Sequence, residues 1–65
     1  MMKVILRYKV DDSDSLIYEP EKIEGSWTLS EVNKNGDLTI YRTNEYVLSP
    51  MPIAHFAAGQ WVQAT

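Results

Sequence analysis

Acidic side chains crowd one segment of the chain, positions 11 to 24, where Lys22 is the only cation. Clustered carboxylates can hold a hard cation such as Ca²⁺, or they can attract a basic protein surface. Counting a calcium loop from Asp12 puts Ile17 where that loop requires glycine, so we expect no metal site. The segment is either an ordinary solvated face or a partner-binding surface. The predicted contact residues are Asp11, Asp12, Asp14, Tyr18, Glu19, Glu21 and Glu24, with Tyr18 as an aromatic anchor.

Catalytic chemistry finds little support in the sequence. His55 is the single histidine, and no serine or carboxylate stands near it in the chain to complete a catalytic group. The three glycines are far apart, so there is no glycine-rich phosphate loop. We therefore expect a protein that is not an enzyme and that needs no cofactor.

Aromatic side chains suggest a second kind of binding. Tyr8, Trp27 and Tyr41, together with Arg42, have the composition of a surface that stacks the bases of single-stranded nucleic acid. The favoured interpretation is different, because large rings supply most of the burial in a small domain. On that interpretation the core consists of Tyr8, Trp27, Phe56 and Trp61.

Length and composition restrict the possibilities further. A chain of 65 residues forms one domain, residues 1–65, with a stability of only a few kcal/mol. It has no cysteine, so disulfides cannot support it, and homodimerisation stays open as another support. The net charge of −3 argues against non-specific nucleic-acid binding. No apolar run is long enough for a signal peptide or a membrane helix, so we expect a cytoplasmic protein.

The first half of the chain reads as short strands. Residues 3–10 alternate, with Val4, Leu6, Tyr8 and Val10 on one face, which is typical of a half-buried strand. The acidic turn follows, and residues 16–20 form a short strand that ends at Pro20. Gly25 is expected to supply a turn with positive φ.

Residues 26–43 predict a β-hairpin, for which two registers compete. A two-residue turn at Asn35-Gly36 would mix apolar and polar side chains on both faces. A three-residue loop, 34–36, instead places Val32 opposite Leu38 and Leu29 opposite Tyr41, so we expect this register. Trp27 and Leu29 then lie on the face opposite Ile40. Either a bulge near Ser30 corrects this mismatch, or both faces are partly covered.

The last third is harder to assign. Residues 46–49 are expected to form a strand, and Pro50 and Pro52 exclude a central strand after it. The alanine-rich run predicts a short helix near residues 52–58 that ends at Gly59. Residues 60–64 are either its continuation past Gly59 or a last strand that closes against the first, with the strand favoured by Trp61 and Val62.

The predicted fold is mainly β: a small curled antiparallel meander or partly open barrel, SH3-like or OB-like, of five or six strands with that short helix. Such a domain is typical of a non-enzymatic protein-binding module, a regulator or inhibitor whose partner has a basic surface, and its size suits a phage or other mobile element. Two alternatives remain open: a binder of single-stranded nucleic acid, and a structural subunit that self-assembles.

Overall fold

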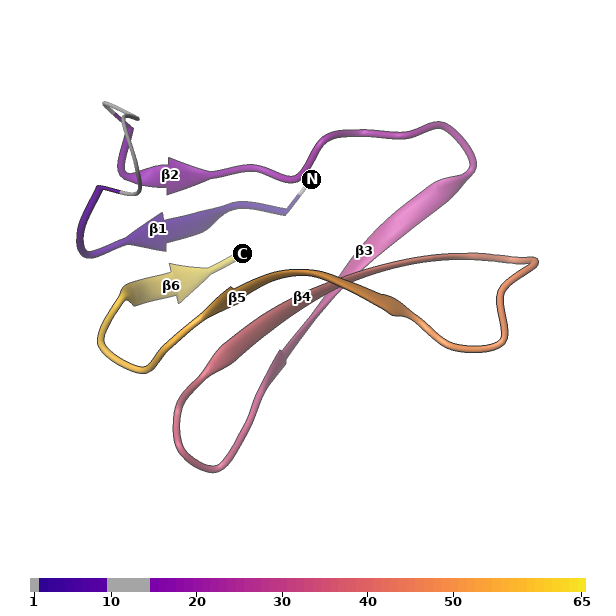
Figure 1. The fold of residues 1–65 in the computed structure, drawn as a ribbon. Helices are drawn as coiled ribbons and strands as arrows, with labels where there is room; N and C mark the ends of the chain where they lie inside the picture. Colours follow the sequence, from indigo (N-terminus) through magenta and orange to yellow (C-terminus); the bar gives the residue numbers. More distant parts are fainter. Residues whose placement is uncertain (1, 10–14) are drawn as a thin grey trace.

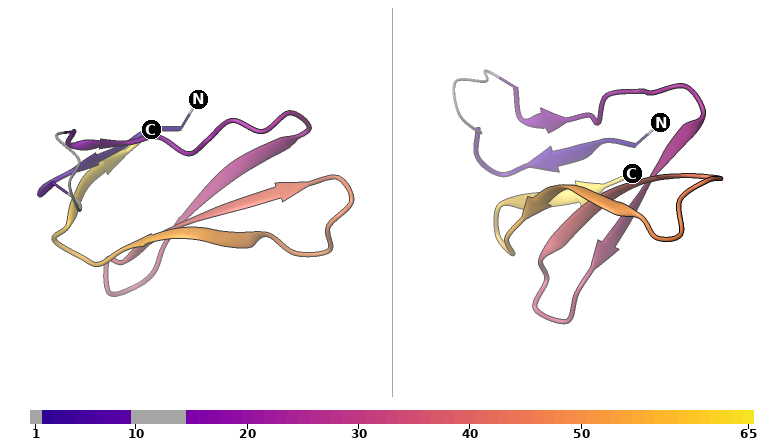
Figure 2. Two further views of the ribbon diagram at one scale, coloured as in Figure 1. Left: turned by 45° about the horizontal axis from the view of Figure 1, so that its top comes forward. Right: turned by 45° about the vertical axis from the view of Figure 1, so that its right-hand side comes forward.

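Two antiparallel sheets of three strands each make up the part of the chain that the computed structural model describes, residues 2–9 and 15–65 (Figure 1). The strands are β1 (Val4–Leu6), β2 (Ile17–Tyr18), β3 (Ser26–Val32), β4 (Leu38–Asn44), β5 (Met51–Phe56) and β6 (Trp61–Ala64). Their order is β2-β1-β6 in one sheet and β3-β4-β5 in the other. Figure 2 shows the sheets as two layers, joined by the turn after β5 and by the segment between β2 and β3.

The predicted β class, the antiparallel pairing and the strand number are confirmed. The strands form two open sheets and not the single meander that was one of the two predicted arrangements. The last strand pairs with the first, as its favoured assignment predicted, and Val4 lies opposite Ala64. Within the described residues the two sheets stay open and do not close into a barrel. None of these residues forms a helix that could cross a membrane.

The β3–β4 hairpin has the predicted register. Val32 lies opposite Leu38 and Leu29 opposite Tyr41, and the pairing runs without a shift along the whole ladder. The three-residue loop is therefore confirmed, and the alternative of a bulge near Ser30 is wrong. The mismatch of faces is instead left in place, with the outer face of this sheet only partly covered.

The turn of this hairpin is closed by its own side chains. The Asn33 N–H donates to the Asp37 carbonyl at 3.1 Å, and the Asn33 side-chain oxygen accepts from the Asn35 and Asp37 N–H groups at 2.9 and 3.0 Å. Gly36 has φ of 88°, a conformation that other residues adopt at a cost. The sequence Asn-Lys-Asn-Gly-Asp thus folds locally into this loop.

The predicted helix near residues 52–58 is wrong, because Met51–Phe56 is strand β5 and pairs with β4. Pro52 lies beside a register shift in this edge strand, where a missing N–H is tolerated. Gly59, with φ of 92°, belongs to the turn that leads into β6. The strand expected at residues 46–49 is also absent, and this segment is an exposed loop. The favoured strand at 60–64 is confirmed as β6.

The core is smaller and more aliphatic than predicted. Among the described residues, the buried hydrophobic side chains are Val4, Leu6, Leu38, Ile40 and Phe56. Of the rings expected there, Phe56 is buried and Trp61 packs partly against the core. The prediction is wrong for Tyr8 and Trp27, which are 65% and 50% exposed. Tyr8 lies beyond β1, which ends at Leu6, and Trp27 lies on β3 at the edge of its sheet.

At one end of the molecule, hydrogen bonds join the two sheets. The Asp37 carboxylate accepts the Ala58 N–H at 2.9 Å, and the Trp61 indole N–H donates to the Gly36 carbonyl at 2.9 Å. These bonds tie the β3–β4 turn to the turn between β5 and β6. We call this group of residues, Gly36, Asp37, Ala58 and Trp61, the clasp. It leaves the sheets free to diverge at the other end of β4.

The clasp makes the stability depend on pH. The Ala58 N–H bond above all, then the Asn33 side chain and the charge of His55, lower the pKa of Asp37 below its ordinary value of 3.8. The ionised carboxylate therefore stabilises the fold above the unfolded pKa, and this contribution is lost as the pH falls through the lower folded pKa.

Asp37→Asn is accordingly expected to lower Tm at pH 7, because the amide is a weaker acceptor for the Ala58 N–H. Acidification from pH 5 to pH 2 is expected to lower Tm less in this variant than in the wild type. Thermal unfolding followed by circular dichroism measures both effects. Glu31→Gln, at an exposed position of β3, is the control. Parallel Tm–pH profiles for Asp37→Asn and the wild type would contradict the role of the carboxylate.

Candidate functional site

The inner face of the β3–β4 sheet changes character along its length. At the clasp end, Leu38 and Ile40 face the core. Arg42 lies two residues further along β4, on the same side of the strand by the alternation of its side chains. On β3 the residue opposite Arg42 is Thr28, and Ser30 lies opposite Ile40. A face that is apolar at one end thus becomes polar and cationic at the other.

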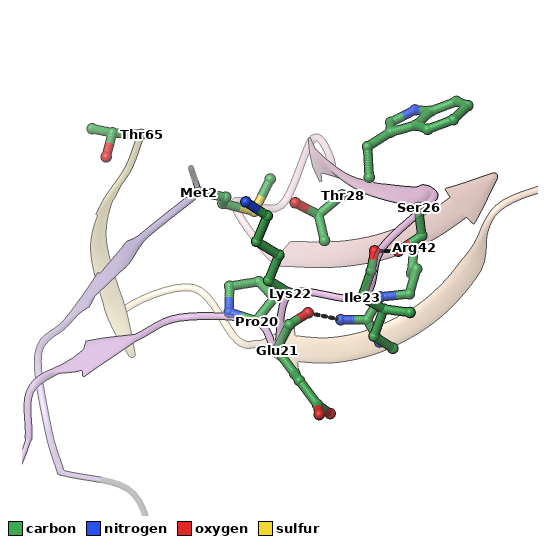
Figure 3. Close-up of a pocket in the computed structure, with 10 residues that line it drawn as sticks. Met2, Pro20, Glu21, Lys22, Ile23, Ser26, Thr28, Arg42 and Thr65 are labelled. Carbon is green, nitrogen blue, oxygen red and sulfur yellow. Dashed lines mark hydrogen bonds between the residues drawn. The ribbon is translucent and has the colours of Figure 1, made fainter.

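A cleft of about 650 Å³ opens at this polar end (Figure 3). Its apolar lining comes from Met2, Pro20, Ile23 and Trp27. Its polar lining includes Lys22, Ser26, Thr28 and Arg42. The segment between β2 and β3 supplies one wall, β3 and β4 supply another, and the residues next to β1 and β6 complete it. Mixed apolar walls with a few convergent polar groups are typical of a binding site.

Arg42 is the least satisfied group in this cleft. Its Nη2 donates to the backbone carbonyl of Glu21, while its Nε–H is buried and has no hydrogen-bond partner. Within residues 2–9 and 15–65 the guanidinium makes no ion pair. Figure 3 shows the Glu21 carboxylate pointing out of the cleft, away from Arg42. A guanidinium carries five N–H donors, so this one retains unused hydrogen-bonding capacity.

Lys22 adds a second positive charge to the cleft. Figure 3 shows its side chain extending back over the cleft toward Met2. The Ser26 hydroxyl is already engaged, since it donates to the Ile23 carbonyl at 2.7 Å and fixes the turn before β3. Gly25, with the predicted positive φ, completes that turn.

The predicted acidic surface is only partly visible. Asp11, Asp12 and Asp14 lie outside the described residues. The other three acids, Glu19, Glu21 and Glu24, are exposed on the segment that borders the cleft. Tyr18 is half-buried and packs its ring edge-on against Phe56, with centroids 5.3 Å apart. Its ring is therefore a support of the core, and only part of it is open to a partner.

The predicted nucleic-acid residues are divided by the fold. Trp27 and Arg42 line the same cleft. Tyr41 points to the opposite face of β4, because it is the neighbour of Arg42 in the strand. Tyr8 follows β1, in the other sheet, and is exposed. Two of the four residues are thus brought together.

His55 lies exposed on β5, with its Nδ1 atom 3.1 Å from the Thr39 hydroxyl. The nearby Asp37 carboxylate accepts from Ala58 and Asn33 and so serves the clasp. Thr39 and His55 lie opposite each other on β4 and β5, so their contact joins these two strands.

The sequence contained a signal for this cleft that the predicted sites missed. In the alternation Leu38, Ile40, Arg42, a cation occupies a position in the apolar phase of a strand. On β3, Ser26 and Thr28 likewise place polar side chains at alternate positions. Groups of this kind can bind an anion beside apolar side chains. No protein-family model matches the chain, and comparisons with curated proteins and with solved structures find no significant match.

Proposed function

We propose that this protein is a non-enzymatic module that binds another protein. The observation that carries the proposal is the outer edge of β3, with which no strand of the described residues pairs. Trp27 and Leu29, 50% and 40% exposed, stand on this strand. An unpaired edge offers backbone hydrogen bonds to an extended segment, and exposed tryptophan is a common anchor of protein interfaces.

The charges beside the cleft suit a partner that carries basic groups. Glu19, Glu21 and Glu24 are exposed on the segment that borders the cleft. Charges that complement those of a partner accelerate the encounter and select that partner. A small acidic domain of this kind suits a regulator or inhibitor that works in the cytoplasm by occupying a surface of its target.

Affinity capture from host lysate tests the proposal when variants are compared. Trp27→Ala combined with Leu29→Ser is expected to lose the captured partner, because it removes the apolar anchors from β3. Leu48→Ser, at another exposed position, is the matched control and is expected to retain it. Replacing Glu19, Glu21 and Glu24 by glutamine is expected to weaken capture most at low salt. Equal capture by the double variant and the control would refute binding through β3.

A second candidate is binding of single-stranded nucleic acid, favoured by the joint presence of Trp27 and Arg42 in one cleft. The acidic segment beside the cleft and the net charge of −3 oppose it. Titration with oligothymidylate at low salt, followed by tryptophan fluorescence, separates the two candidates. Quenching that is reversed by salt would favour nucleic acid.

A further inference from the structure

A positive charge that is partly buried in a cleft has an energetic cost, which a partner of opposite charge would reduce. Arg42 is in phase with the buried Ile40, its Nε–H is buried without an acceptor, and no described carboxylate pairs with it. A partly buried charge is unfavourable unless an opposite charge and hydrogen-bond acceptors compensate it. A carboxylate ligand would supply the opposite charge and would bind through the Nη groups, since the buried Nε–H is not accessible to it.

Resting on the proposed function, we infer that the cleft at Arg42 receives the C-terminal carboxylate of the partner polypeptide. Arg42 binds the carboxylate, and Lys22 adds a second cation from the rim. The apolar wall, which includes Met2, Pro20 and Ile23, receives the side chain of the last residue. The preceding residues extend along the free edge of β3, so that end capture and strand addition act together.

The surrounding charges favour a carboxylate over a phosphate. The cleft has one guanidinium and one ammonium, while Glu21 also lines it and Glu24 follows in the same segment. A polyanion would be repelled by these acids, whereas a single terminal carboxylate places one negative charge at the cations. A basic side chain further back in the same peptide would then lie near the acids. A C-terminal residue is attached to the peptide on one side only, so it brings one flanking backbone segment into the cleft. An internal acidic residue would bring two.

Nuclear magnetic resonance titration of the full chain tests this site directly. The probes are an equimolar pool of acetylated tripeptides with free C-terminal carboxylates and the same pool with C-terminal amides. The free-acid pool is expected to shift the Arg42 Nε–H and the Trp27 indole N–H signals. The amidated pool is expected to need at least a tenfold higher concentration for the same shift.

Matched variants assign the effect to the guanidinium. Arg42→Gln is expected to abolish the preference for the free acid, whereas Arg7→Gln, the same change at an exposed arginine, is expected to keep it. Lys22→Gln, at an exposed position, is expected to weaken free-acid binding several-fold. The comparison of acid and amide on the wild type needs no variant, so it decides even if Arg42→Gln does not fold.

Three outcomes would overturn the inference. They are equal binding of acid and amide, no shift of the Arg42 signal at millimolar peptide, and shifts caused by oligothymidylate but not by the peptides. Failure here is distinguishable from failure of the proposed function. A bait with Arg42→Gln that still captures a partner dependent on Trp27 and Leu29 removes the carboxylate site and leaves protein binding intact.

Discussion

Ile40→Ala is expected to lower the free energy of unfolding by about 2–5 kcal/mol, the usual cost of emptying a buried aliphatic position. Ile40 is fully buried in β4, between the two sheets, in a core of few side chains. A domain of this length has roughly 3–10 kcal/mol in total. The substitution therefore removes a large share of the stability, and we expect Tm to fall by at least about 10 °C.

Urea unfolding followed by tryptophan fluorescence measures this loss, and circular dichroism gives Tm. Leu48→Ala is the control, because Leu48 is fully exposed in the loop between β4 and β5 and makes no contribution to the core. Its free energy of unfolding should stay within about 0.5 kcal/mol of the wild type. If Ile40→Ala were as mild as this control, the described core would be wrong.

Gly36→Ala is expected to destabilise the protein through two effects that act at the clasp. The positive φ of 88° costs any residue with a Cβ about 1–2 kcal/mol. In addition, the new Cβ would lie 3.3 Å from the Ala58 Cβ, closer than an ordinary contact. Ala58 has little freedom to move away, since its N–H is bound by Asp37. We expect the combined loss to exceed the backbone term alone.

The chain provides its own controls for this experiment. Gly25 and Gly59 have φ of 83° and 92°, and a Cβ at either position would meet nothing within 4 Å. Gly25→Ala and Gly59→Ala therefore report the backbone cost without the contact. Chemical denaturation of the three variants should rank Gly36→Ala as the least stable. An equal loss of unfolding free energy in all three variants would show that the close approach of the two turns adds no destabilisation.

Local features of the fold were predictable because neighbouring residues determine them. The loop at 34–36 needs only the Asn33 side chain, a glycine at positive φ and the alternation of the flanking strands, all within a short span. A slip of one residue would invert both faces, so the pattern alone selects the register. The alternation of Val4 and Leu6 was predictable for the same reason.

Assignments that depend on distant partners failed. The run 52–58 has helical composition, but an isolated helix of this length gains few internal hydrogen bonds. Pairing with β4 gives residues 51–56 an interstrand ladder with one register shift, and Leu38 opposite Phe56 buries the ring. Exposure was misjudged likewise, since Trp27 is aromatic but half exposed on the edge strand β3, where it borders the cleft. Composition reports how apolar a side chain is, and topology decides which side chains are covered.

The sequence by itself determined a β domain, its central hairpin, the positive-φ turns and the absence of cysteine chemistry, because each depends on residue type or on contacts a few positions apart. Only the tertiary structure decided that the strands divide into two sheets, that the clasp joins two turns, and that Arg42 faces a cleft instead of solvent. A strand pattern states which residues share a face. Whether that face meets a core or an opening depends on the second sheet, whose strands lie far away in the chain.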